Sequence, residues 1–98
     1  MNITKEKDGK KLILKVEGRV DSTTSAEFES EAKAELDGVE ELVLDFADLS
    51  YISSAGLRVL LSLHKTMISK GKMKVINPND TVSDIFEVTG FSEVLTIE

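Results

Sequence analysis

The sequence has no cysteine and only one histidine among its 98 residues. The absence of cysteine excludes disulfides, thiolate metal sites and cysteine nucleophiles, and it suits a reducing cytosol. No stretch reaches the roughly 20 apolar residues of a membrane span, and the first residues lack the apolar core of a signal peptide. We therefore expect a cytoplasmic protein with no membrane partner.

The single histidine also argues against catalysis by a serine. A serine hydrolase places its nucleophile in Gly-x-Ser-x-Gly, with a histidine within hydrogen-bond reach. Here Ile52 stands two residues before Ser54, and His64 follows later in the same expected helix, roughly 15 Å along its axis. Asp45 and Asp48 have no further metal ligands near them in the sequence, and no P-loop motif is present. We expect no enzyme activity, no metal and no cofactor.

Basic residues are also scarce, with 12 lysines and arginines against 18 acidic residues and a net charge of −6. This balance argues against nucleic acid as a partner, because phosphate backbones attract basic surfaces. The bases are unevenly distributed, since residues 49–79 contain five of them and no acid. We interpret these mainly as lysines that complement a helix dipole. A surface of mixed sign that steers a protein partner is the alternative.

Hydrophobic residues make up 41% of the chain, so we expect a folded globule rather than a disordered segment. A chain of this length can form one core and little more. It contains no linker, internal repeat or low-complexity stretch. The sequence therefore predicts a single domain over residues 1–98.

The hydrophobic pattern predicts several strands. Apolar and charged residues alternate over residues 11–17, as in a strand with one buried face. Residues 2–7 are expected to pair with this strand through a tight turn at Asp8-Gly9. Residues 42–46 are almost continuously apolar, which is typical of a strand covered or flanked on both sides. A short strand is expected at residues 73–76, and a terminal strand or extended tail at residues 91–97.

The first predicted helix carries an apolar stripe, because an apolar residue recurs at every fourth position from Phe28 to Leu36. Thr24 and Glu27 have the spacing of a capping box at its start. The dipeptide Asp37-Gly38 is expected to end this helix.

A second helix is expected to follow a polar turn at residues 48–54 and to end at Gly71, and a third to end at Gly90. Strands that alternate with helices imply right-handed crossovers and a largely parallel sheet. The predicted fold class is α/β. We expect a mixed, mostly parallel sheet of four or five strands, opened by an N-terminal hairpin, with three or more helices. The pattern alone leaves the strand order open.

Two adjacent serines, Ser53 and Ser54, stand where the second helix begins. The simplest role for such a pair is to cap the helix. The same position favours an anion, because free backbone N–H groups and the positive end of the helix dipole meet there. Ala55 and Gly56 are small enough to let another protein approach, and Arg58 follows within one turn and can pair with a phosphate. A phosphorylated serine is therefore the functional alternative to a cap.

Several segments together resemble the STAS domain of anti-sigma factor antagonists, and the resemblance covers nearly the whole chain. They are Gly18-Arg19-Val20-Asp21, residues 42–50, Ser53-Ser54-Ala55-Gly56-Leu57, Asn77-Pro78 and Val88-Thr89-Gly90-Phe91. The resemblance implies that Ser54 is the phosphorylated serine and that Asp21 is an acidic residue near it. Ser53 stands where the family often has aspartate, and Ala55 where it often has serine or threonine. Ser53 is therefore a second candidate acceptor.

The resemblance implies a protein-binding switch rather than an enzyme. The unphosphorylated domain would bind an anti-sigma factor with a histidine-kinase-like ATPase fold, which frees the sigma factor for transcription. That kinase would phosphorylate Ser54 and end the complex, and a serine phosphatase would restore it. The expected partner-binding residues are Asp21, Ser53, Ser54, Gly56 and Arg58. The chief alternative is a constitutive STAS scaffold, or an accessory subunit of a transporter or signalling complex, without phosphorylation.

Overall fold

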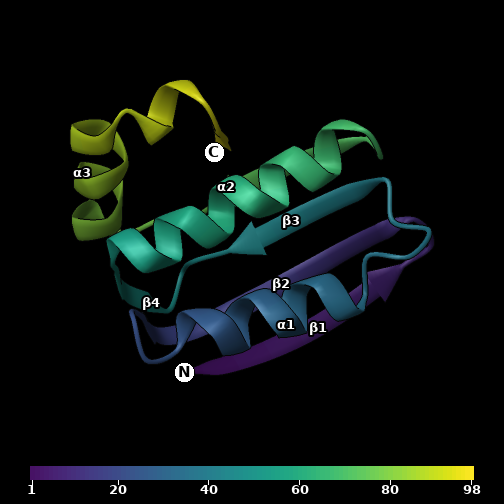
Figure 1. Ribbon diagram of the computed structural model, residues 1–98, viewed down its shortest axis with the longest axis horizontal. Helices are drawn as coiled ribbons and strands as arrows, with labels where there is room; N and C mark the ends of the chain where they lie inside the picture. Colours follow the sequence, from purple (N-terminus) through teal and green to yellow (C-terminus); the bar gives the residue numbers. More distant parts are fainter.

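The computed structural model describes all residues, 1–98, and it has the predicted α/β architecture (Figure 1). The strands and helices follow one another as β1 (Asn2–Asp8), β2 (Lys11–Val20), α1 (Ser25–Ala34), β3 (Glu41–Asp45), β4 (Leu49–Ile52), α2 (Ser54–Ile68), β5 (Lys72–Ile76), α3 (Asp80–Thr89), a 3-10 helix η1 (Phe91–Glu93) and β6 (Thr96–Ile97).

The sheet has six strands, in the order β1-β2-β3-β5-β6, with β4 pairing β2 beside this path. The β1–β2 pair is an antiparallel hairpin, and every other pair is parallel. The hairpin turns at Asp8-Gly9 as predicted, and Gly9 has a φ of +61°, which glycine adopts without strain. The mixed, mostly parallel sheet is thus confirmed.

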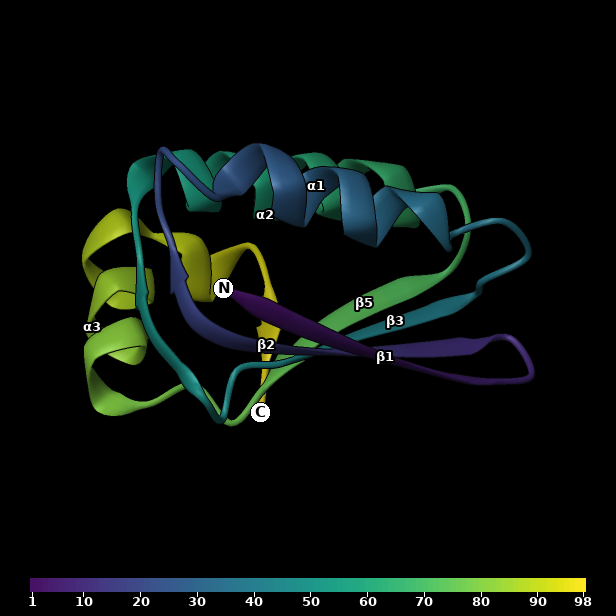
Figure 2. The same ribbon diagram turned by 90° about the horizontal axis from the view of Figure 1, so that it is seen from below.

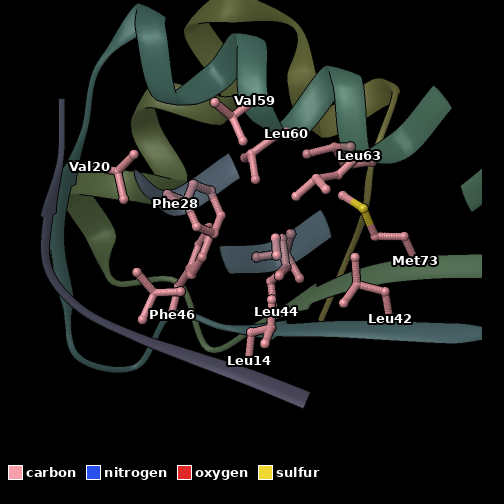
Figure 3. Packing of buried hydrophobic residues seen from close by; sticks show 14 of the residues in the cluster. Leu14, Val20, Phe28, Leu42, Leu44, Phe46, Val59, Leu60, Leu63 and Met73 are labelled. Atoms are coloured by element: carbon pink, nitrogen blue, oxygen red, sulfur yellow. The ribbon is translucent and has the colours of Figure 1, made fainter. Parts of the chain in front are cut away.

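Helices α1 and α2 lie side by side on one face of the sheet, while α3 lies at its end, next to β4 (Figure 2). The core lies between the sheet and the helices, where Phe28 of α1, Leu42 and Leu44 of β3, and Leu60 and Leu63 of α2 are fully buried (Figure 3). Apolar side chains of both layers are removed from water at this contact, and their burial is the main source of stability.

Strand β3 is flanked on both sides, by β2 and β5, as predicted, although helices cover only one face of it. Leu42 and Leu44 face α2, so Val43 points to the opposite face of the sheet. Ile13 and Lys74 stand beside Val43 in register on the neighbouring strands. Val43 is nevertheless only 2% exposed. The neighbouring side chains, rather than a second helical layer, keep water from it.

The prediction of a turn at residues 48–54 was wrong for Leu49–Ile52, which form strand β4. Local pattern indicated a turn because the segment is short and partly polar. The strand forms because it pairs with the last residues of β2, at Val20 and Ile52, about thirty residues apart in the sequence. This pairing accounts for the sheet having one strand more than the upper limit that we expected.

The capping box predicted for α1 is also absent. Thr24 occupies the N-cap position without a side-chain cap. Its hydroxyl instead donates to the carbonyl oxygen of Arg19 and accepts from the backbone N–H of Asp21. The helix ends at Ala34, before the predicted stop at residues 37–38. Thr24 therefore ties the start of α1 to the end of β2 rather than to its own first turn.

Candidate functional site

The candidate site lies where β2 and β4 end and α2 begins. Val20 and Ile52 are paired at the ends of their parallel strands. The backbone N–H of Ser53 donates a hydrogen bond of 2.8 Å to the carbonyl oxygen of Val20. This bond brings the chain around Asp21 next to the start of α2, although the two segments lie about thirty residues apart in the sequence.

Ser54 is the first residue of α2, and it is exposed. The helix carries no acidic residue in its first turn, so none of its own side chains there repels a bound or added anion. The first N–H groups of a helix lack partners within the helix, and the helix dipole is positive at this end. The structure thus places the Ser54 hydroxyl in solvent, at a position that is electrostatically suited to a phosphate.

Ser53 differs sharply from its neighbour. It is the N-cap residue of α2 and has extended backbone angles, yet its side chain caps nothing. The Ser53 Oγ is buried and has no hydrogen-bond partner. The interpretation of the pair as simple capping residues is therefore wrong. Of the two hydroxyls, that of Ser54 is the one open to a modifying enzyme.

Gly56 lies on the buried face of α2, whereas Ser54 is exposed. A Cβ atom at this position would come within 2.6 Å of Cγ1 of Ile52 and 2.8 Å of Cγ1 of Val20. These distances are too short for real contacts, so only glycine lets the helix approach the strand ends this closely. Gly56 therefore sets the position of the first turn of α2, and with it the position of Ser54.

Asp21 directly follows the last residue of β2, and its side chain is 28% exposed. Its carboxylate accepts hydrogen bonds from the hydroxyl of Thr23 at 2.6 Å and from the backbone N–H of Thr23 at 2.9 Å. These two bonds, with a smaller contribution from Thr24, lower the pKa of Asp21 below its ordinary value. The site therefore contains a fixed negative charge beside the start of α2.

Arg58 is exposed one turn after Ser54, on the same side of α2. It borders a shallow groove of about 270 Å³ between α1 and α2, which Glu29 and Val59 also line. The structure thus brings Ser54, Arg58 and Asp21 to one end of the molecule. The largest hollow, about 480 Å³, is lined mainly by charged residues at the start of strands and contains none of the predicted site residues.

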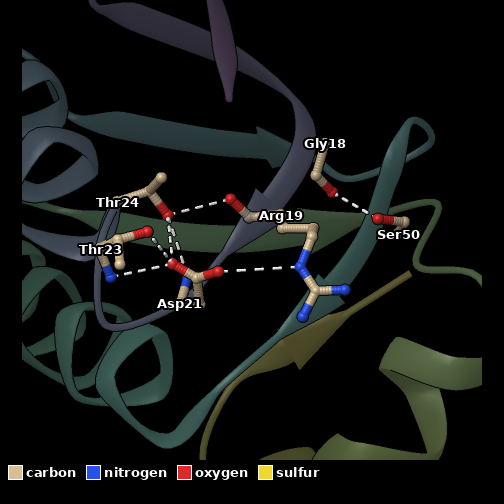
Figure 4. Close-up of polar contacts among 6 residues, drawn as sticks. All are labelled: Gly18, Arg19, Asp21, Thr23, Thr24 and Ser50. Atoms are coloured by element: carbon tan, nitrogen blue, oxygen red, sulfur yellow. Dashed lines mark hydrogen bonds and ion pairs between the residues drawn. The ribbon is translucent and has the colours of Figure 1, made fainter.

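Two residues that we did not single out from the sequence, Arg19 and Tyr51, also belong to this end of the molecule (Figure 4 shows Arg19 beside Asp21). The Arg19 guanidinium carbon lies 4.7 Å from the centre of the Tyr51 ring. The Nε of Arg19 is 3.7 Å from Oδ2 of Asp21. Their sequence positions give no signal of this contact, because it depends on how β2 and β4 pair.

Comparison with known proteins identifies the class to which this fold and site belong. The family model described as "STAS domain" matches residues 2–98. The Bordetella bronchiseptica protein BtrV, whose name designates it an anti-sigma factor antagonist, is 34% identical over 99 residues, covering 99% of this chain and 85% of BtrV. The chain therefore belongs to the STAS domain family. The anti-sigma factor antagonists of this family are non-enzymatic regulators.

Solved structures agree with this fold at low sequence identity. An anti-sigma factor antagonist of Thermotoga maritima aligns with a TM-score of 0.90 at 19% identity, covering 97% of this chain and 84% of that one. The unphosphorylated form of the anti-sigma factor antagonist SpoIIAA aligns with a TM-score of 0.83 at 18% identity, covering 99% and 88%. The phosphorylated form of SpoIIAA from Bacillus aligns with a TM-score of 0.75 at 16% identity, covering 99% of this chain and 91% of that one.

In this chain, no helix is both long and apolar enough to cross a membrane.

Proposed function

We propose that this chain is an anti-sigma factor antagonist that binds its anti-sigma factor when unphosphorylated and is released by phosphorylation of Ser54. The observation that carries the proposal is the contrast at the start of α2, where Ser54 is exposed and the Ser53 oxygen is buried. The relationship to BtrV supports an anti-sigma factor as the partner. SpoIIAA has the same fold and exists in phosphorylated and unphosphorylated forms, which supports control by phosphorylation.

The switch acts at the interface rather than on the fold. A phosphate adds about −1.5 to −2 charges and three acceptor oxygens. At a helix N-terminus its local effect is on the order of 0.3–2 kcal/mol and favourable. The helix itself is held by buried Leu57, Leu60 and Leu63, which a charge at Ser54 does not disturb. Phosphorylation therefore leaves α2 folded.

The same charge opposes docking when it is pressed against an acidic or apolar partner surface. A loss of ~3–4 kcal/mol there weakens binding by about two to three orders of magnitude. In this proposal the partner has a histidine-kinase-like ATPase fold and supplies the ATP, and a serine phosphatase reverses the reaction. Asp21, Ser53, Gly56 and Arg58 contribute to the surface or to its shape, and the chain itself needs no cofactor.

The proposal is tested by incubating the purified chain with ATP and each anti-sigma factor kinase encoded in the source genome, followed by mapping of phosphate by mass spectrometry. We expect phosphate on Ser54 and none in Ser54→Ala. Binding measured by calorimetry should survive in Ser54→Ala and weaken about 100-fold or more in Ser54→Asp. Ser92→Ala, at another exposed serine, is the matched control and should behave as wild type. Tight binding by Ser54→Asp together with loss of binding in Ser54→Ala would exclude this model.

A constitutive scaffold is the second candidate function, and the serine at position 53 favours it. The family often has an acidic residue there, whereas this chain has a buried, uncharged hydroxyl. A scaffold would bind its partner with or without a charge at Ser54. The same experiment separates the two functions, because a scaffold incorporates no phosphate and tolerates Ser54→Asp.

A further inference from the structure

A β-bulge lies where β2 and β4 pair, immediately before the candidate site. Gly18 pairs with Leu49 and Arg19 with Tyr51, so Ser50 is an extra residue on β4. The Ser50 hydroxyl donates a 2.8 Å hydrogen bond to the carbonyl oxygen of Gly18 (Figure 4), and Gly18 has a φ of +94°. Bulges often occur beside functional sites, where they redirect a side chain. Arg19 is the first residue of β2 after the bulge.

Contacts with Tyr51 and Asp21 hold the Arg19 side chain without using its hydrogen-bonding capacity. Its guanidinium stacks on Tyr51 at 4.7 Å, and its Nε lies 3.7 Å from the Asp21 carboxylate, a distance too long for a hydrogen bond. Figure 4 shows the two terminal nitrogens of Arg19 pointing away from Asp21. The Arg19 side chain is 61% exposed. An oriented cation with free donors therefore faces solvent.

This pair is continuous with the switch site. Arg19 directly precedes Val20, whose carbonyl oxygen accepts the hydrogen bond from Ser53. Tyr51 lies two residues before Ser53 on the strand that leads into α2. The Arg19 and Tyr51 side chains lie on the face of these strands opposite the buried Val20 and Ile52. A protein that covers both Ser54 and the ends of β2 and β4 also meets the Arg19–Tyr51 pair.

We propose that the Arg19–Tyr51 pair binds a carboxylate side chain of the protein that docks over Ser54; this inference rests on the function proposed above. A guanidinium presents its N–H groups as a planar fork, which matches a carboxylate through two parallel hydrogen bonds. Stacking on Tyr51 fixes the plane of this fork before binding, so less side-chain entropy is lost in the complex. Tyrosine and arginine are also the residue types that most often dominate binding at interfaces.

Asp21 positions this fork rather than competing for it. Its carboxylate already accepts two hydrogen bonds from Thr23, and it faces the Nε edge of Arg19. The terminal nitrogens on the other side of the guanidinium remain for the partner. The partner is therefore expected to present an aspartate or glutamate to the face formed by β2 and β4.

The test uses the anti-sigma factor kinase that phosphorylates the chain, with binding measured by calorimetry. Arg19→Gln should weaken binding about tenfold, and Arg19→Lys should recover only part of the loss because lysine lacks the planar fork. Tyr51→Leu should weaken binding about threefold or more, whereas Tyr51→Phe keeps the ring and should bind as wild type. Lys65→Gln removes one exposed positive charge from α2 outside this pair and is the matched control.

Kinetics and charge reversal provide further readouts that a structural role would not produce. Arg19→Gln should raise the KM of the kinase for this chain and leave kcat unchanged, because docking is weakened and the Ser54 hydroxyl is not moved. Binding lost in Arg19→Glu should return when one acidic residue of the partner's docking surface is changed to lysine. Amide spectra of all variants should keep the resonances of the core strands. If Arg19→Gln fails to fold, Arg19→Lys and Tyr51→Leu decide the question.

Each contrary outcome is distinct. If Ser54→Asp breaks the complex and Arg19→Gln binds as wild type, this inference is wrong and the proposed function stands. If no kinase binds the chain, or Ser54→Asp binds as wild type, both fail together. If Arg19→Gln instead separates a homodimer of this chain in sedimentation, the pair binds a second copy and the proposal of a kinase carboxylate is overturned.

Discussion

The backbone N–H of Ser53 donates a 2.8 Å hydrogen bond to the carbonyl oxygen of Val20. This bond joins the end of the second strand to the start of the second helix. It therefore brings together Asp21, with its lowered pKa, and Ser54, with its exposed hydroxyl. Asp21 and Ser54 belong to different segments and form one site only because of this contact.

Gly56→Ala should destabilise the protein by about 1–3 kcal/mol, because the added methyl group would overlap the buried side chains of Ile52 and Val20. In an exposed helix the same change usually stabilises by about 1 kcal/mol, so the sign of the effect tests the packing. Urea denaturation measures it. Thr66→Ala in the same helix is the control and should change stability by less than about 0.5 kcal/mol. A Gly56→Ala protein more stable than wild type would contradict this account of Gly56.

Ser53→Ala should leave the stability unchanged or raise it by about 1 kcal/mol, because it removes a buried hydroxyl that has no hydrogen-bond partner. If Ser53 capped the helix, the same substitution would instead lower the stability of the protein by about 1 kcal/mol. The comparison variant is Asn79→Ala, since the Asn79 side chain does cap α3 by accepting from the backbone N–H of Val82 at 2.8 Å. Chemical denaturation should show a loss for Asn79→Ala only. Equal losses in both variants would mean that Ser53 caps α2 in solution.

The effect of a charge at position 54 on stability should depend on the sign of that charge. Ser54→Asp should raise the stability by about 0.3–1 kcal/mol and Ser54→Lys should lower it by a similar amount, because the helix dipole is positive at this end. Both effects should shrink in high salt, where exposed charges are screened. Thermal denaturation at low and high ionic strength measures them. The prediction fails if Ser54→Asp lowers the stability, since a phosphate would then disturb α2 itself.

Asp21 should make stability depend on pH below about 4. Hydrogen bonds from Thr23 hold its pKa below the ordinary value of 3.8, so the folded protein favours the charged carboxylate. A lowered folded-state pKa contributes stability that is present above the unfolded pKa and is lost as the pH falls through the folded pKa. The difference in unfolding free energy between wild type and Asp21→Asn should therefore shrink as the pH falls below about 4.

Direct titration of the Asp21 carboxyl carbon by NMR gives the second measurement of this effect. We expect a midpoint below 3.8 in wild type and a midpoint closer to that value in Thr23→Ala, which removes the shortest hydrogen bond to the carboxylate. An Asp21 midpoint at or above 3.8 would show that Thr23 does not stabilise the charged form.

Most of the helices and strands could be predicted because they depend on local patterns. The alternation over residues 11–17, the turn at Asp8-Gly9 and the apolar stripe of the first helix each involve residues within a few positions of one another. The exposed position of Ser54 also belongs to this group, since it follows from where the helix starts. The short strand β4 was missed because its pairing partner lies far away in the sequence.

The sequence by itself determined the α/β class, the hairpin, the family resemblance and a serine at the start of the second helix, because each is encoded by neighbouring residues. Only the tertiary structure decided that the Ser53 oxygen is buried, that Gly56 packs against Ile52, and that Arg19 stacks on Tyr51. The physical reason is that these contacts arise from the register of β2 with β4 and from the close approach of α2 to the ends of both strands. Register and approach are set by the packing of the whole core, which no local pattern records.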